Sequence, residues 1–225
     1  TLFRSSGDFE KANFPIGVEG GKTSTCPTQN LMEAYDMKDG TPFVWNNQSN
    51  PYDNRDPRMK YTIVCNEMKW PVDPVEIWEG GTNGLPLQNA TTTGYYLKKY
   101  VNNTISFEAG STVTKKQHNW VLFRYGEILL NYAEAMINAF HDPNYKDAVY
   151  NMSAREAVNQ IRGRTNISLP GFPSDITEKD FVKRLKNERR VELAFEGHRF
   201  WDVRRWKELG QTANIYGVKI TKNNE

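Results

Sequence analysis

The segment Glu188–Trp206, with the sequence ERRVELAFEGHRFWDVRRW, constrains the fold more than any other part of the chain. It places five arginines, three glutamates and one aspartate among four aromatic residues. On a helix, steps of three and four residues give one apolar side from Val191 to Trp201 and a second from Leu193 to Val203. A helix with two apolar sides needs neighbours on both, so the segment predicts a helix enclosed by other elements.

A charged stripe on the same helix allows two interpretations. Glu188, Glu192 and Glu196 lie four residues apart and would repel one another if unpaired. In one interpretation, Glu188 and Glu192 form a carboxylate pair for acid–base hydrolysis. We favour the other, an ion-pair network between helices, because no nucleophile motif or glycine loop accompanies the carboxylates and guanidinium groups bind them bidentately. The predicted members of the network are Arg124, Glu127, Glu188, Glu192, Glu196 and Arg199, with Arg189 as a further candidate partner.

Two patterns have a metal-binding alternative. His198 and Asp202 are spaced by four residues but have no third ligand nearby in the sequence. Asp53 and Asp56, in NPYDNRDPR, are close in sequence but lack the spacing of an EF-hand loop. The first pattern is therefore weak as a metal site, and for the second we favour a turn network; we expect neither a metal nor a cofactor.

The character of the sequence changes near Gly110. The first 110 residues hold 10 of the 16 glycines and 8 of the 11 prolines, in turn signatures such as MKDGTP and GGTNGLP. Strand-like runs occur only at Lys60–Cys65 and Thr93–Val101. The sequence predicts that this half consists of ordered loops with a few short strands.

Helical periodicity begins at Asn119. Apolar residues recur at spacings of three and four from Leu122 to Phe140, and Pro143 ends this predicted helix. A second helix is predicted from about 153 to 164. A third begins after Thr177, whose TEKD pattern resembles a capping box, and either continues or bends at Gly197 before ending near residue 209. Short connections between these helices favour antiparallel pairing.

Composition excludes several classes of protein. A net charge of +2 favours neither a nucleic acid nor an anionic membrane surface as partner. The chain has no run of about eighteen apolar residues, which a transmembrane helix would need. Two cysteines, Cys26 and Cys65, do not make a disulfide framework, and we favour unpaired thiols. The first residues show no starting Met and no targeting segment, so we expect a mature product or a fragment of a longer protein.

Five motifs, taken together, resemble the signatures of the SusD/RagB family. Ahead of the helices stand PTQNLMEAYDMKDG and NPYDNRDPRM, and in the helices stand FRYGEILLNYAEA, AVNQIRGRTN and ERRVELAFEGHRFWDVRRW. They span Pro27 to Trp206, most of the chain, and the last of them is the most specific. The resemblance implies a mainly α fold, with tetratricopeptide-like antiparallel helix pairs packed with an irregular loop-rich region and a few short strands.

The resemblance also implies a function. Members of this family are lipoproteins on the outer-membrane surface that bind oligosaccharide or polysaccharide without hydrolysing it and deliver it to a TonB-dependent, SusC-like transporter. The chain lacks the lipidated N-terminal cysteine and the early helices of the family. We therefore expect residues 1–225 to be the C-terminal half, with a loop-rich part at 1–110 and a helical part at 119–210. The membrane anchor is expected in sequence outside this chain.

A glycan site needs aromatic rings for the apolar faces of sugars and polar groups for their hydroxyls. Such groups lie in the loop-rich half, although no motif assigns any one of them. Trp70 and Trp78 are the favoured rings, because proline, glycine and charged residues surround them, whereas Trp201 and Trp206 are expected in the core. Burial against the helices is the alternative for each ring. The candidate ligand-binding residues are Trp45, Trp70, Trp78, Tyr95, Asn66 and Asn83, with Tyr96 and Asn46 as neighbours of the same kind.

Three functions follow from these observations. The favoured one is non-catalytic glycan binding within an uptake complex. The alternative is a helical scaffold for protein–protein contact in that complex, without its own glycan site, in which the aromatic residues are interface anchors. A glycosidase with two carboxylates ranks last, because nothing in the sequence places two acids in one cleft.

Overall fold

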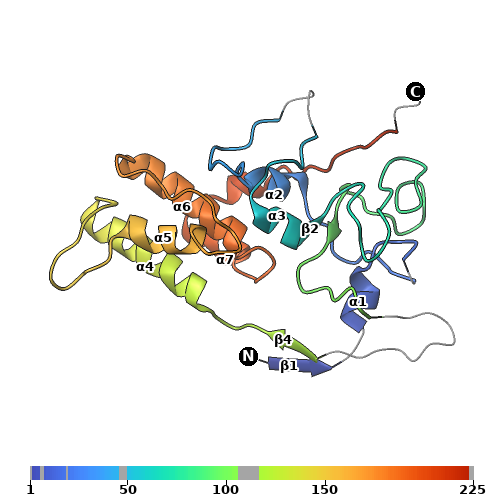
Figure 1. The fold of residues 1–225 in the computed structure, drawn as a ribbon, viewed down its shortest axis with the longest axis horizontal. Helices are drawn as coiled ribbons and strands as arrows, with labels where there is room; N and C mark the ends of the chain where they lie inside the picture. The colour runs from blue at the N-terminus through green and yellow to red at the C-terminus, as the bar shows by residue number, and fades with distance from the viewer. Residues whose placement is uncertain (1, 6–7, 19, 46–49, 106–116, 223–225) are drawn as a thin grey trace. The chain divides into compact units, whose positions relative to one another are not determined.

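The computed structural model describes residues 2–5, 8–18, 20–45, 50–105 and 117–222 (Figure 1). Helices dominate its regular structure and the strands are short, which confirms the predicted mainly α fold class. In chain order the elements are β1 (Leu2–Ser5), α1 (Asp8–Asn13), α2 (Gln29–Ala34), α3 (Pro57–Thr62), β2 (Ile63–Val64), β3 (Tyr96–Leu97), β4 (Gln117–Trp120), α4 (Tyr125–Phe140), α5 (Ala154–Arg162), α6 (Glu178–Glu192), α7 (Arg199–Arg205) and the 3₁₀ turn η1 (Leu209–Thr212).

The chain forms two compact units, each assembled from segments that are distant in sequence. Unit 1 comprises Thr1–Glu33, Met59–Trp120 and Leu209–Glu225. Unit 2 comprises Ala34–Arg58 and Val121–Glu208. Residues 34–58 thus group with the helices, although their composition is that of the loop-rich part.

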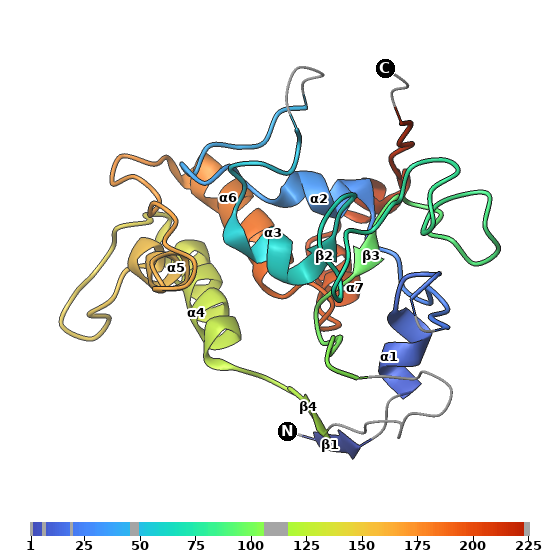
Figure 2. The same cartoon turned by 45° about the vertical axis from the view of Figure 1, so that its right-hand side comes forward.

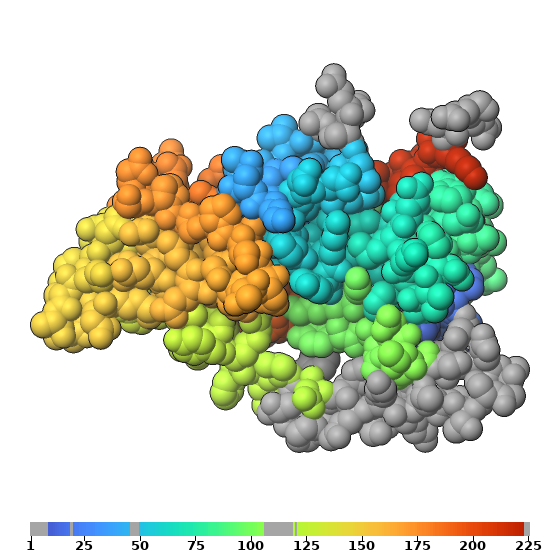
Figure 3. Space-filling view, in the orientation of Figure 1, coloured from blue at the N-terminus to red at the C-terminus, as the bar shows by residue number. Residues whose placement is uncertain are grey.

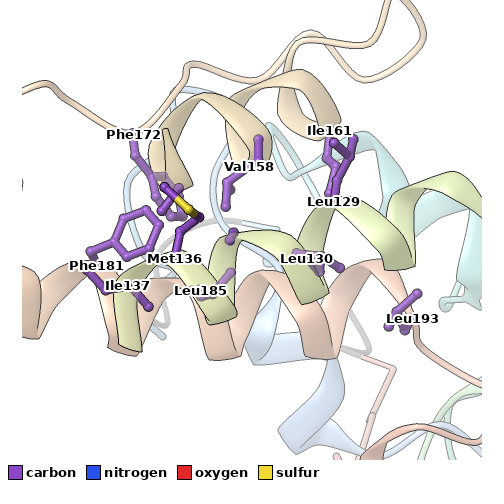
Figure 4. Close-up of a cluster of buried hydrophobic side chains, with 13 residues drawn as sticks. Leu129, Leu130, Met136, Ile137, Val158, Ile161, Phe172, Phe181, Leu185 and Leu193 are labelled. Carbon is purple, nitrogen blue, oxygen red and sulfur yellow. The ribbon is translucent and has the colours of Figure 1, made fainter. Parts of the chain in front are cut away.

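The core of unit 2 lies where α4 packs against both α5 and α6 (Figure 4). Side-chain caps fix where two of these helices begin. Ser153 and Glu156 form a reciprocal capping box at the start of α5, and the Thr177 hydroxyl accepts from the Asp180 N–H at 3.1 Å. The predicted starts of α5 and α6 are confirmed. The buried residues of the cluster are Leu129, Leu130, Ala133, Met136, Ile137, Ala154, Ala157, Val158, Ile161, Phe172, Phe181, Leu185 and Leu193.

Helix α4 begins later than the sequence predicts. Residues 117–120 form strand β4, which pairs antiparallel with β1 in the register Leu2↔Trp120. Arg124 has extended backbone, and the helix starts at Tyr125. The prediction of a helix from Asn119 was wrong, because pairing with a strand more than a hundred residues away sets the backbone there. Leu122, which precedes the helix, and Tyr125, its first residue, are exposed instead of lying on the buried stripe.

The charged segment bends between α6 and α7. Phe195 and Gly197 both have positive φ angles, of 62° and 82°, which a continuous helix does not allow. No atom crowds the position of a Gly197 Cβ, so the left-handed backbone itself accounts for glycine there. Beyond the bend, the end of the first apolar side faces outward, whereas Val203 at the end of the second side is buried. Trp201 is 67% exposed, so its predicted core position was wrong, whereas Trp206 is half-buried.

Helix α3 replaces part of a predicted strand. The Asp56 carboxylate accepts from the Arg58 N–H at 2.9 Å and Pro57 occupies the first helical position, a combination that starts helices. Lys60 therefore lies in α3, and only Ile63–Val64 of the predicted strand is extended. These two residues pair antiparallel with Leu97 and Tyr96, within the second predicted strand, and the two strands lie side by side in the turned view (Figure 2).

Ordered loops make up most of unit 1. Residues 66–94 are held by main-chain hydrogen bonds between turns, such as Val75 N–H to the Met68 carbonyl at 3.0 Å, and they form a closely packed surface (Figure 3). Neither Cys26 nor Cys65 takes part in a disulfide among the described residues. Among the described helices, none combines the length and apolar character that a membrane span requires.

Candidate functional site

The carboxylates of α6 lie inside unit 2, where arginines surround them. Glu188 accepts from Arg58 Nη1 at 2.5 Å and from Arg162 Nη1 at 2.8 Å, and all three side chains are buried. Arg58 also binds both carboxylate oxygens of Asp56. Burial would raise the pKa of the Glu188 carboxyl, but the charges of Arg58 and Arg162 outweigh it and hold the pKa below its ordinary value.

Glu192 has three guanidinium partners. It accepts from Arg58 Nη1 at 2.9 Å, from Arg124 Nη1 at 2.6 Å and from Arg164 Nη2 at 2.8 Å. Arg124 continues to Glu196, which it reaches with Nε and Nη2, both at 2.8 Å. Burial acts to raise the pKa of Glu192, yet the charge of Arg58 and the hydrogen bond and charge of Arg124 lower it to about 2. We call Asp56, Arg58, Arg124, Arg162, Arg164, Glu188, Glu192 and Glu196 the ion-pair cluster.

The ion-pair cluster is unsuited to acid–base chemistry on a substrate. A glycosidase needs one carboxylic acid with a raised pKa and a second carboxyl facing the sugar or a water. Glu188 and Glu192 instead have lowered pKa values, and both oxygens of each carboxylate accept from guanidinium groups. This arrangement supports a structural role, in which bidentate contacts fix the register between segments.

Other predicted members of the network lie at the α6–α7 bend and nearby. Glu127 Oε2 is 3.7 Å from His198 Nε2, and Arg199 is the first residue of α7. Arg189 pairs with Asp202 at 2.8 Å rather than with the glutamates. The described residues include no group of three or more potential metal ligands, so His198 and Asp202 gain no third ligand there.

Sequence reasoning missed half of the ion-pair cluster. Arg58 and Asp56 come from DNRDPRM, and Arg162 and Arg164 come from the IRGR of α5 and its end. Each lies in a motif that carries the family resemblance. Their place in these motifs was the signal that could have identified the four residues, because the spacing of residues in the sequence does not show that the segments meet.

The predicted aromatic residues of unit 1 divide by burial. Tyr95 is fully buried and its hydroxyl donates to Gln29 Oε1 at 2.5 Å. Tyr96 is also fully buried and donates to the Asn83 carbonyl. Neither ring has a face open to a ligand. Trp78 is half-buried, with the Lys222 ammonium 5.0 Å from its ring centre.

The remaining candidates are spread between the two units. Trp45 belongs to unit 2, is 44% exposed and meets Phe43 edge to face. Asn46 lies outside the described residues. Asn66 accepts from the Ile77 N–H at 2.8 Å, so its side-chain oxygen holds a loop together.

Unit 1 contains a hollow of about 370 Å³ lined by residues 70–75, 82–83 and 17–18. A turn shapes one wall, because the Trp70 N–H bonds the Asp73 carbonyl at 2.8 Å. The Asn83 side chain links two segments beside the hollow, because it accepts from the Glu76 N–H at 2.9 Å and donates to the Ile16 carbonyl at 2.5 Å. Of the six candidate ligand residues, this hollow brings together Trp70 and Asn83.

Two further hollows are present among the described residues. One, of about 360 Å³, lies in unit 1 between residues 77–94 and the segment 217–220, and Lys219 pairs with Glu79 there at 2.8 Å. The other is a broad, open depression of about 880 Å³ over α5 in unit 2, where Lys146 pairs with Glu156 at 2.7 Å. In both, charged side chains of the lining already neutralise one another.

Comparison with known proteins identifies relatives of this chain. The model of the SusD family matches residues 5–225. A solved SusD-like protein from Bacteroides fragilis is 26% identical, with a TM-score of 0.77 over 98% of this chain and 46% of its own. A SusD-like carbohydrate binding protein from the same species is 25% identical, with a TM-score of 0.76 over 96% of this chain and 43% of its own.

A curated relative, SusD-like protein P38 of Formosa agariphila, is 37% identical over 91 residues. Those residues are 38% of this chain and 16% of the relative. The chain thus spans less than half the length of these solved structures and a smaller share of the curated protein.

Proposed function

Because this chain belongs to the SusD family, we propose that the protein it comes from binds an oligosaccharide or polysaccharide at the cell surface and delivers it to a TonB-dependent, SusC-like transporter. The observation that carries this proposal is the match to the family over residues 5–225. Likeness to a SusD-like carbohydrate binding protein over 96% of the chain supports a sugar as the ligand. The full-length protein would act on the outer membrane as a lipoprotein, anchored through sequence outside this chain.

The proposed binding is non-catalytic. The buried carboxylates that most resembled a hydrolytic pair, Glu188 and Glu192, are held ionised by arginines and have no proton to donate at neutral pH. The loops of unit 1 supply the features that a binding site needs, namely aromatic and polar groups around a hollow on a structured framework.

The test is isothermal titration calorimetry of the full-length protein against a panel of polysaccharides, with an assay for released reducing sugar in parallel. We expect binding of at least one polysaccharide and no release of reducing ends. Hydrolysis of the bound glycan would contradict the non-catalytic mechanism. Absence of binding across the panel would remove the basis for a glycan receptor.

Exposed aromatic side chains on unit 2 favour a second candidate, a scaffold that contacts the transporter without its own glycan site. Phe200 and Trp201 on α7 are exposed and meet edge to face at 4.9 Å, and Phe123 and Tyr125 before and at the start of α4 are exposed as well. Aromatic residues are typical anchors of protein interfaces. If Trp201→Ala reduces co-purification of the transporter and no glycan binds, the scaffold is the better description.

A further inference from the structure

We propose that the hollow lined by residues 70–75 and 82–83 is a subsite for one neutral, hydroxyl-rich sugar unit, bound by the indole N–H of Trp70 and the carboxylate of Asp73. The inference rests on the proposed glycan binding and specifies where and how one sugar is held. It uses groups that the fold of unit 1 leaves without partners.

Trp70 supplies the donor. Its side chain is only 6% exposed, and its buried Nε1 has no hydrogen-bond partner among the described residues. A buried N–H without a partner is unfavourable. Because Nε1 is covered in the structure, a ligand oxygen in the hollow would reach it after a small shift of the neighbouring side chains, and the new hydrogen bond would remove that penalty. The Lys98 ammonium lies 5.2 Å from the centre of the ring. Burial and this contact mean that Trp70 acts through its polar edge, not as an open stacking face.

Asp73 supplies the acceptor. It lies three residues after Trp70 on the same turn, closed by the bond from the Trp70 N–H to the Asp73 carbonyl. Its side chain is exposed and forms no ion pair or hydrogen bond with any described residue. Each sugar hydroxyl both donates and accepts. A donor and an acceptor on one turn therefore suit two neighbouring hydroxyls.

The rest of the lining favours a neutral sugar. Pro71, Val72 and Pro74 give apolar walls for the C–H groups of the ring. Asp73 is the one charged residue among those that line the hollow, so a uronate or sulfate group would meet a like charge. The side-chain amide of Asn83 accepts from the Glu76 N–H and donates to the Ile16 carbonyl, which makes Asn83 a positioning residue.

The experiment compares matched variants of the full-length protein by calorimetry. The probes are the neutral maltohexaose, cellohexaose, mannohexaose and xylohexaose, with an oligogalacturonate as the acidic counterpart. Trp70→Phe keeps a ring and removes the N–H, and we expect about three- to tenfold weaker binding of the neutral hexasaccharide that the wild type prefers. Asp73→Asn removes the charge with little change of shape, and we expect a loss of about tenfold.

Two control variants separate the subsite from general effects. In Trp206→Phe the lost indole N–H already has a protein partner, Glu134 at 2.8 Å, in unit 2. Asp175→Asn changes an exposed carboxylate outside the hollow. Both should bind sugar like the wild type. If Trp70→Phe lowers the melting temperature, the affinity of Asp73→Asn still tests the subsite. A second test is the nuclear magnetic resonance spectrum of the ¹⁵N-labelled wild-type protein, in which the indole signal of Trp70 should shift on addition of sugar.

Each outcome bears on the proposal. Weaker binding by both variants together with a shifted Trp70 signal supports the subsite. Wild-type affinity in both variants overturns it and leaves glycan binding intact. Preference for the oligogalacturonate that depends on Trp70 overturns the assignment of a neutral sugar. Failure of every probe to bind the wild type, in this set and in the polysaccharide panel, overturns the proposed function and the subsite with it.

Discussion

Replacing Glu192 by Gln should destabilise unit 2 strongly while leaving sugar affinity unchanged. The Glu192 carboxylate accepts from Arg58, Arg124 and Arg164, and its side chain is almost completely buried. Glutamine keeps the shape and removes the charge. Arg58, itself buried, would then lose one of the carboxylates that compensate its guanidinium group. Removing one partner of a buried ion pair destabilises a fold much more than replacing the whole pair with apolar residues, because the remaining charge is left buried without compensation.

The magnitude follows from the protonation equilibrium of Glu192. Its pKa falls from the ordinary 4.5 to about 2, and at about 1.36 kcal/mol per pKa unit this difference is worth roughly 3 kcal/mol. Removal of one partner of a buried ion pair destabilises by about 3–5 kcal/mol in other proteins, which agrees. Because the folded pKa is the lower one, this stabilisation is complete above about pH 4.5 and is lost as the pH falls through about 2.

The assay is urea unfolding of the full-length protein, followed by near-ultraviolet circular dichroism at pH 7 and at pH 3. The control is Glu178→Gln at the start of the same helix, where the side chain is 47% exposed and pairs with an exposed His141. We expect a loss below about 1 kcal/mol for the control and a several-fold larger loss for Glu192→Gln that shrinks on acidification. Equal losses in the two variants would refute a stabilising ion-pair cluster. Unchanged stability with lost sugar binding would move Glu192 to the binding site.

Three further changes test the fold. Leu130→Ala, in the fully buried core of unit 2, should lower the free energy of unfolding by about 2–5 kcal/mol in urea titrations, and a loss below 1 kcal/mol would contradict close packing there. Ser153→Ala removes the capping box of α5 and should lower stability by about 1 kcal/mol, seen as a lower melting temperature, whereas Ser153→Asp should retain the cap. Gly17→Ala should destabilise unit 1 by more than about 1 kcal/mol, because Gly17 has a φ of 85° and an added Cβ would lie 2.6 Å from the Thr82 carbonyl oxygen. Faster amide hydrogen exchange at Asn83 would report that damage, and unchanged exchange would count against the close approach.

The helices that the sequence predicted well are those in which local signals agree. At α5 and α6, a capping side chain, a helical period of apolar residues and a polar opposite face all indicate the same element. Ser153 and Thr177 therefore locate two helix starts without knowledge of the rest of the chain. Ala154, Ala157, Val158 and Ile161, which share one face of α5 by their spacing, are all buried.

The predictions that failed depend on a distant strand partner in one case and on a local bend of the backbone in the other. The apolar period from Leu122 onward looked helical, yet Trp120 is held in a strand by pairing with Leu2. Trp201 has the spacing of a buried residue, but the left-handed backbone at Phe195 and Gly197 changes the direction of the chain before α7 begins. The spacing of apolar residues describes a single helix. It reveals neither the strand with which a segment pairs nor a bend in the backbone.

The candidate binding residues show the same limit at the level of single side chains. Trp70 and Trp78 were favoured because their neighbours in sequence are proline, glycine and charged residues. This criterion describes the surroundings of a residue along the chain, not those in space. Trp70 is nevertheless buried, and its indole N–H has no hydrogen-bond partner among the described residues. A sugar bound there would be selected by the direction of hydrogen bonds more than by stacking, because a buried ring edge discriminates hydroxyl geometry while an open face accepts most sugar rings.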